Sequence, residues 1–267
     1  MNLKRKLKLG IIGLSAAFLV ACGSTPADSG SGSGSEEKLV VGTDAAYAPF
    51  ESLDGEKIVG FDVELLSAVM KEAGLEYELK NIGWEPLFIA LQNNEVDAGI
   101  SAITINDERK KSYDFSSPYF ESVNMILAKE GTSIKSAKDL EGKKVSVQNG
   151  TTGQEALEKM FGANENVKKY ENNVLAIQAL LNGEVEAVVA DNAVVQEYAK
   201  NNPDKKLVTI TDKENFESEF YGIIFPKDGE HQEEINKAVK KVIEDGKYAE
   251  IYKKWFGEEP NVDALKQ

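Results

Sequence analysis

The segment Ala90-Leu-Gln-Asn-Asn-Glu-Val-Asp-Ala98 is nearly repeated 89 residues later as Ala179-Leu-Leu-Asn-Gly-Glu-Val-Glu-Ala187. Both copies predict a helix that ends, a turn at Asn-x-Glu and a strand that follows. The first copy runs into Ser101-Ala-Ile-Thr104 and the second into Ala190-Asp-Asn192. Because ligand sites in open α/β sheets lie at the carboxyl ends of strands, the repeat suggests two similar units that face one cleft. The alternative is a chance similarity of a common helix–turn–strand unit.

Strands and helices alternate on both sides of this repeat, which predicts an α/β fold with largely parallel sheets. We expect the two C-terminal helices to pack back on the first unit. The predicted strands are residues 38–42, 96–103, 144–147, 185–190 and 221–225, and the predicted helices are 61–73, 84–92, 233–244 and 248–256.

The N-terminus has the pattern of a secretory leader. Four cations at positions 4, 5, 6 and 8 precede an apolar stretch over 9–20, which is shorter than the roughly 20 residues that span a bilayer. The stretch ends in Leu19-Val-Ala-Cys22, which resembles a lipobox. We therefore expect a signal peptide over 1–21, a lipid on Cys22 and a flexible Gly/Ser tether over 22–37. A cleaved leader with an incidental cysteine is the alternative.

The composition is acidic, with 31 Lys and Arg against 45 Asp and Glu and a formal net charge of −14. Nucleic-acid binding requires a basic face, so we expect no nucleic-acid partner. About 230 residues remain after the tether, which suits one large or two small domains. We expect a monomer.

Residues suited to catalysis are few. His231 is the only histidine and lies in a charged stretch, and Cys22 is the only cysteine. A Ser-His-Asp triad, a Cys-His dyad and a zinc site therefore have little support, and no phosphate-binding glycine loop is present. We expect no cofactor and no metal. A carboxylate-only acid–base pair stays open, because no local pattern selects two of the 45 acids.

Two segments predict helix N-termini that could bind an anion. Residues 104–111 follow a predicted strand, with Thr104 or Asn106 as the cap and Arg109 one turn in. Arg109 could grip a carboxylate with two hydrogen bonds, although a surface arginine is the commoner outcome. Residues 148–155 contain Thr152-x-x-Glu155, a capping-box pattern, and Thr152 could simply cap its helix.

Asp191 ends a predicted apolar strand. A carboxylate there is costly unless it is paired. A ligand ammonium would pair with it, and a nearby lysine or a helix cap would serve equally well.

With these motifs in view, the chain resembles the polar amino-acid-binding proteins of ABC importers, such as the glutamine-, histidine- and arginine-binding proteins. The resemblance covers essentially all of 38–260 and implies a type II periplasmic-binding-protein fold, in which two α/β lobes are joined by a two-stranded hinge. Lobe 1 would be 38–120 plus 221–267 and lobe 2 would be 121–220, with crossings near 119–124 and 218–221. The most specific segments are 42–51, 59–62, 103–109, 113–116, 150–152 and 251–257.

The resemblance also implies ligand contacts. Arg109, with the amides of Thr104 and Thr152, would bind an α-carboxylate. Asp191 would bind the α-ammonium with help from Ser101 and Ala102, where the family often has a second serine in place of Ala102. Tyr47 and Trp84 would line the side-chain pocket, and Asp44, Glu51 and Gln148 are candidates to read the polar end of the ligand side chain.

Together with the lipobox-like segment, the resemblance implies an extracytoplasmic lipoprotein, anchored to the outer face of the cell membrane, that closes on one amino acid and delivers it to an ABC permease. We expect a basic ligand, with arginine first and lysine or histidine weaker. Residues 81–87 and 148–155 match arginine-binding members closely, and the two aromatic rings could enclose a guanidinium. Glutamine is the alternative ligand. A dehydratase acting on prephenate-like acids and a receptor sensor domain are the alternative functions.

Overall fold

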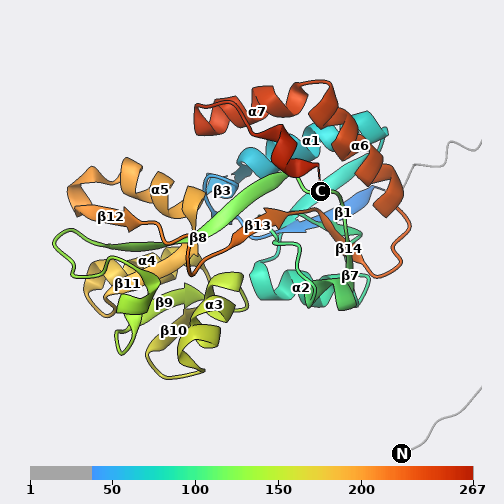
Figure 1. Cartoon of the computed structure of the whole chain (residues 1–267). Helices are drawn as coiled ribbons and strands as arrows, with labels where there is room; N and C mark the ends of the chain where they lie inside the picture. The colour runs from blue at the N-terminus through green and yellow to red at the C-terminus, as the bar shows by residue number, and fades with distance from the viewer. Residues whose placement is uncertain (1–37, 267) are drawn as a thin grey trace, which may run out of the picture. The chain divides into compact units, whose positions relative to one another are not determined.

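The computed structural model describes residues 38–266 (Figure 1). The predicted signal peptide, the lipid attachment site Cys22 and the tether lie outside the described residues. Within 38–266, no helix has both the length and the apolar character needed to span a membrane.

The first sheet has the strand order β5-β1-β6-β14-β7. Strand β1 pairs in parallel with β5 and β6, whereas β14, which comes from the C-terminal part of the chain, pairs antiparallel with β6 and β7. The first sheet is therefore parallel over β5, β1 and β6, and it is antiparallel where β14 joins β6 and β7. Its strands are β1 (Leu39–Thr43), β5 (Tyr77–Asn81), β6 (Ala98–Gly99), β7 (Tyr113–Phe115) and β14 (Ile224–Pro226).

The second sheet has the order β10-β9-β11-β8-β12, with β13 pairing along β8. Strands β9, β10 and β11 are parallel, and β8 is antiparallel to β11, β12 and β13. The strands are β8 (Phe120–Lys129), β9 (Val145–Gln148), β10 (Val167–Tyr170), β11 (Ala187–Asp191), β12 (Leu207–Ile210) and β13 (Ser218–Tyr221). The accompanying helices are α3 (Thr152–Phe161), α4 (Asn173–Asn182) and α5 (Asn192–Asn201).

The chain passes between the two sheets in the paired strands β8 and β13 (Figure 1). Phe120 and Tyr221 stack at this pairing with ring centroids 5.4 Å apart and an angle of 14° between the rings. Both rings also pack on Phe50, which is fully buried. The crossing strands are thus fixed to the aromatic core beside the first sheet. The exact lobe boundaries stay a prediction.

Helices α1 (Phe61–Ala73), α6 (Gln232–Glu244) and α7 (Lys247–Phe256) pack against one another beside the first sheet. Phe61 and Phe256 meet edge to face with centroids 5.2 Å apart. The return of the C-terminal helices to the first unit is therefore confirmed. A small antiparallel sheet of β2 (Ala46–Tyr47), β3 (Glu51–Asp54) and β4 (Lys57–Val59) precedes α1.

The sequence repeat corresponds to a structural repeat. The turn after helix α2 (Trp84–Gln92) contains Asn94 and the turn after helix α4 contains Gly183 at the equivalent position, both with positive φ, 55° and 78°. The amide of Glu95 donates to the Ala90 carbonyl at 2.8 Å, and the amide of Glu184 donates to the Ala179 carbonyl at 2.9 Å. The prediction of two similar helix–turn–strand units is confirmed down to these hydrogen bonds.

Two strand predictions were wrong in their bounds. Over 96–103 only Ala98–Gly99 pairs as a strand, because the backbone turns away and Ala102 takes φ 47°. The predicted strand 221–225 is broken between β13 and β14. At Gly222 an added Cβ would lie 2.8 Å from the Ile105 side chain, so the backbone passes close to the Ile105 segment there.

Two helix-start predictions were also wrong in detail. Residues 104–111 form only the 3-10 turn η1 (Arg109–Lys111), and Asn106 Oδ1 accepts from the Arg109 amide at 2.8 Å. Helix α3 is capped by Thr151 rather than Thr152, since Thr151 Oγ1 accepts from the Gln154 amide at 3.5 Å. The cap position thereby leaves the Thr152 hydroxyl free for another acceptor.

Candidate functional site

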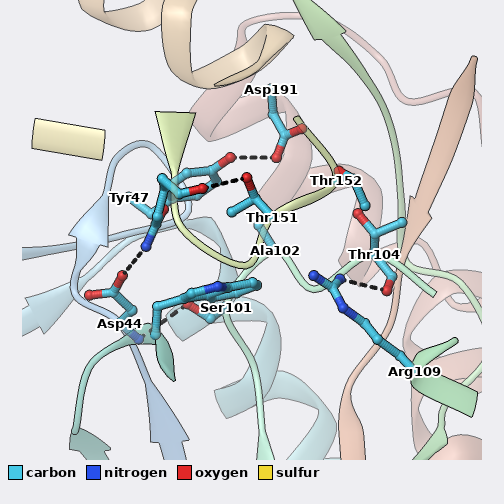
Figure 2. Close-up of a pocket in the computed structure, with 11 residues that line it drawn as sticks. Asp44, Tyr47, Ser101, Ala102, Thr104, Arg109, Thr151, Thr152 and Asp191 are labelled. Atoms are coloured by element: carbon cyan, nitrogen blue, oxygen red, sulfur yellow. Dashed lines mark hydrogen bonds between the residues drawn. The ribbon is translucent and has the colours of Figure 1, made fainter. Parts of the chain in front are cut away.

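A cavity of about 310 Å³, a volume that includes space open to solvent, lies between the carboxyl ends of strands from both sheets. Figure 2 shows that its lining residues come from segments far apart in the sequence. The structure brings together ten of the eleven predicted ligand residues and adds Thr151. The lining residues are Asp44, Tyr47, Trp84, Ser101, Ala102, Thr104, Arg109, Gln148, Thr151, Thr152 and Asp191.

Asp44 and Gln148 form one end of the cavity. Asp44 directly follows β1 and is only 7% exposed. Its Oδ2 accepts from Gln148 Nε2 at 3.0 Å, and Gln148 is itself held by Asn173. Burial raises the pKa of Asp44, while the Gln148 hydrogen bond opposes that rise. This end of the cavity therefore presents a buried carboxylate whose bonded partner is a neutral amide.

Asp191 and Tyr47 meet across the cavity. The Tyr47 hydroxyl donates to Asp191 Oδ2, which joins the small β2–β4 sheet to the end of β11. Asp191 stands at the N-cap position of α5, but its side chain makes no capping hydrogen bond. Burial raises the pKa of Asp191, and the Tyr47 hydroxyl and the charge of Arg109 act against that rise. The carboxylate thus faces the cavity rather than its own helix.

The segment from Ser101 to Thr104 forms the floor. Asp44 N donates to Ser101 Oγ at 3.1 Å. Ala102 has φ 47°, in the left-handed region that costs a residue with a Cβ about 1–2 kcal/mol. Its amide donates to Asp62 Oδ2 at 2.8 Å, which fixes this conformation. The strained backbone is therefore supported from behind the cavity.

Glu51 belongs to that support and does not line the cavity. It is fully buried, and its Oε1 accepts from Ser101 Oγ at 2.6 Å. Burial and the charge of Asp62 raise its pKa well above the ordinary value, and burial raises the pKa of Asp62 to about 6. Of the candidates for the polar end of the ligand side chain, Glu51 is the one that the structure places outside the cavity lining: it lies behind the cavity with Asp62 and holds Ser101 in place.

Arg109 closes the opposite end. Nη1 donates to the Thr104 carbonyl at 2.9 Å and Nη2 to the Gly150 carbonyl at 3.3 Å. Its Cζ lies 5.4 Å from the ring centroids of both Trp84 and Phe88, which are cation–π distances. Burial lowers the pKa of Arg109, and nearby acids oppose this. Trp84 therefore supports the protein's own guanidinium, a contact that the sequence did not predict.

The N-terminus of α3 borders the cavity with Thr151 and Thr152. The Thr151 hydroxyl donates to the Gln148 carbonyl at 2.8 Å. The Thr152 hydroxyl donates to Glu219 Oε2 at 2.7 Å. Sequence reasoning missed Thr151 and Glu219. The Thr-Thr pair left the cap ambiguous, and nothing around Glu219 distinguishes it from neighbouring acids.

The Arg109 guanidinium and the N-terminus of α3 lie at one end of the cavity. The buried carboxylates of Asp44 and Asp191 lie elsewhere around it. In Figure 2 Asp44 and Arg109 approach from opposite sides, with Asp191 on a third. Such a site fits a small molecule that carries a carboxylate together with cationic groups. Among residues 38–266, no group of three His, Cys, Asp or Glu side chains could hold a metal ion.

Known proteins have sequences similar to this one. The family of bacterial extracellular solute-binding proteins, family 3, matches residues 39–258. A probable histidine-binding protein from Neisseria gonorrhoeae is 39% identical over 97% of this chain and 98% of its own length. The arginine-binding extracellular protein ArtP from Bacillus subtilis is 37% identical over 95% and 98%.

A solved structure extends the likeness. The arginine-, lysine-, histidine-binding protein ArtJ from the thermophilic bacterium Geobacillus stearothermophilus is 63% identical, with a TM-score of 0.86, over 86% of this chain and 100% of that chain. This chain belongs to the bacterial extracellular solute-binding proteins, family 3. The predicted family and the two-lobed α/β fold class are thereby confirmed.

Proposed function

We propose that this protein binds a free basic amino acid, arginine first and lysine or histidine more weakly. The observation that carries the proposal is Asp44, a buried carboxylate at the end of the cavity opposite Arg109, whose bonded partner is the neutral Gln148 amide. A buried charge without a counter-charge is costly. The cationic tip of a ligand side chain would supply that counter-charge.

The main-chain groups of the amino acid would occupy the rest of the cavity. Its α-carboxylate would lie against Arg109 and the amides of Thr104 and Thr152. Its α-ammonium would pair with Asp191, near Ser101 and Ala102. Tyr47 would offer a ring face to the side chain, while Trp84 is already in contact with Arg109. The assignment of these contacts rests on the lining residues and on the charges that they carry.

A glutamine ligand fits this charge pattern less well. Its neutral amide could bond to Gln148 and Asp44 but would leave the buried carboxylate without an opposite charge. The relatives named for arginine, lysine and histidine favour the same choice.

The family and the arrangement of the lobes support a transport role. Lobe-to-lobe bonds such as Tyr47–Asp191 and Gln148–Asp44 form across the cavity. Because a zwitterion between Arg109 and Asp191 would touch both lobes, it would favour their closure about β8 and β13. The protein would then deliver the amino acid to an ABC permease.

We further propose a lipid anchor on Cys22 that holds the protein at the outer face of the membrane. The lipobox-like Leu19-Val-Ala-Cys22 after a short apolar stretch supports it. Cys22→Ala should move the protein from the membrane fraction to the soluble fraction. Equal membrane retention of parent and variant would contradict the anchor.

We propose a binding protein rather than an enzyme, because the named relatives are binding proteins. A thermal-shift screen of the purified protein against the twenty amino acids tests the proposal. Arginine, lysine and histidine should raise the melting temperature and stay chemically unchanged. Stabilisation by none of them, or turnover of a prephenate-like acid, would contradict it.

A further inference from the structure

Glu219 gathers hydrogen-bond donors from three segments. It lies on β13, one of the two crossing strands, and is partly buried. Its Oε2 accepts from the Thr104 hydroxyl at 2.8 Å and from the Thr152 hydroxyl at 2.7 Å. Its Oε1 accepts from Asn124 Nδ2 at 2.8 Å. The Glu219 carboxylate therefore connects Thr104, which follows the first helix–turn–strand unit, with Thr152 at the N-terminus of α3.

Both threonines that bond to Glu219 also line the anion end of the cavity. The charged groups that face Glu219 are Asp191 and Arg109. Arg109 donates to the carbonyls of Thr104 and Gly150, and Glu155 also acts on its charge. A ligand carboxylate bound by Arg109, Thr104 and Thr152 would thus come close to a second carboxylate, and two like charges repel there.

We propose that Glu219 is a proton-exchanging residue of this site, which takes up a proton when the carboxylate of the ligand binds beside Thr104, Thr152 and Arg109. The inference rests on the proposed function, because it requires an α-amino acid in the cavity. Neutral Glu219 would keep Oε1 or Oε2 as an acceptor for the threonines while the repulsion between the two carboxylates disappears.

The environment of Glu219 favours that protonation. Burial and the charge of Asp191 raise the pKa of Glu219 from 4.5 to about 7, against the hydrogen bonds of the two threonines and the charge of Arg109. A group whose pKa is higher in the assembled site than in water favours that site at low pH, and its contribution fades as the pH rises through about 7. A ligand carboxylate beside Glu219 would raise that pKa further, so affinity should be up to about tenfold higher at pH 6 than at pH 8.

Calorimetric titration of the full-length protein with arginine tests this. At pH 7 to 8, titrations in two buffers of different ionisation enthalpy report proton uptake on binding. Glu219→Gln mimics the protonated form, since its amide oxygen can accept from the threonines and the Asn124 amide can turn over to accept from its NH₂. Glu217→Gln is the matched control, an exposed acid two residues away.

The parent and Glu217→Gln should take up a fraction of a proton and bind up to about tenfold more tightly at pH 6 than at pH 8. Glu219→Gln should lose both effects and bind at pH 8 about as tightly as the parent at pH 6. Arginine binding by the parent without proton uptake, or weaker binding by folded Glu219→Gln at pH 8, would overturn the inference alone. No binding of any amino acid by the parent would overturn the proposed function as well. The buffer comparison on the parent decides the case even if the variant does not fold.

Discussion

The two copies of the helix–turn–strand unit have equivalent scaffolds and different ends. In each copy the residue after the turn bonds back to the helix, and the residue two positions further on donates to the neighbouring strand, Asp97 to Val40 and Glu186 to Lys144, both at 2.8 Å. Beyond the strands the copies differ. The first turns at Ala102 with φ 47°, whereas the equivalent position of the second is Asp191, which leads straight into α5.

This difference shows how one scaffold can supply opposite chemistry to one cavity. The turn at Ala102 lets the first copy continue to Thr104 and Arg109, which are donors. The second copy ends in a carboxylate that Tyr47 holds against the cavity. The cavity therefore has a positive charge at Arg109 and a negative charge at Asp191. A zwitterion would fit between them in one orientation.

Removing the charge of Arg109 or of Asp191 should have the largest effect on arginine affinity. Loss of one partner of a buried pair costs about 3–5 kcal/mol, so Arg109→Ala and Asp191→Ala should each lower arginine affinity by more than about a hundredfold. Calorimetry measures the affinity, and melting temperatures should stay near that of the parent. The exposed residues Lys110 and Asp204 provide controls of matching charge, Lys110→Ala and Asp204→Ala. Near-parental affinity in either site variant would remove that residue from the site.

Substitution of Asp44, at the end of the cavity proposed for the ligand side chain, should have a smaller effect that differs between arginine and glutamine. Asp44→Asn keeps an acceptor for Gln148 but removes the negative charge, so arginine affinity should fall about tenfold to a hundredfold while glutamine affinity changes little. Glu51→Gln, which resembles protonated Glu51, should leave the arginine-to-glutamine ratio near that of the parent. A larger change in the ratio for Glu51→Gln than for Asp44→Asn would reverse the two roles.

The buried pair behind the floor should make stability depend on pH. The pKa of Asp62 rises to about 6 in the folded protein and that of Glu51 rises as well. The contribution of the pair is thus largest below their ordinary values near 4 and is lost as the pH rises through and above about 6. Relative to the parent, Glu51→Gln should gain a few degrees in melting temperature between pH 5 and pH 8. The exposed Glu56→Gln should show no such gain, and an identical pH profile for parent and Glu51→Gln would contradict the raised pKa of Glu51.

Substitutions in the turns that follow α2 and α4 should have the smallest effect, a change in the free energy of unfolding. Both need a positive φ, which Asn tolerates better than Ala. Gly183→Ala should therefore cost about 1 kcal/mol of unfolding free energy, and Gly183→Asn should cost clearly less. Denaturant unfolding measures both. Equal costs would mean that the two turns are not equivalent.

Much of the fold could be predicted because it rests on local patterns. The repeat, the bounds of α2 and the two C-terminal helices follow from apolar periodicity and from Asn, Gly and Pro signals. The short β6 and the turn at Ala102 could not be predicted, because they depend on Asp62 and Tyr119 from distant parts of the chain. The apolar run over 96–103 reads as one strand when those partners are unknown.

The site divides in the same way. Ten predicted residues lie around one cavity because several motifs marked them together, and their roles toward a ligand stay predictions. Glu51 and Glu219 show what a sequence conceals. Whether an acid faces a cavity, supports its wall or joins two lobes depends on burial and on neighbours that are far away in the sequence, 115 positions in the bond between Thr104 and Glu219.

Direct titration of the purified parent with arginine, lysine, histidine and glutamine in one buffer tests the central claim, that the cavity binds a basic amino acid with Asp44 as its counter-charge. Arginine should bind most tightly, lysine and histidine more weakly, and glutamine should bind more weakly than arginine. Glutamine binding tighter than all three basic amino acids would contradict the claim.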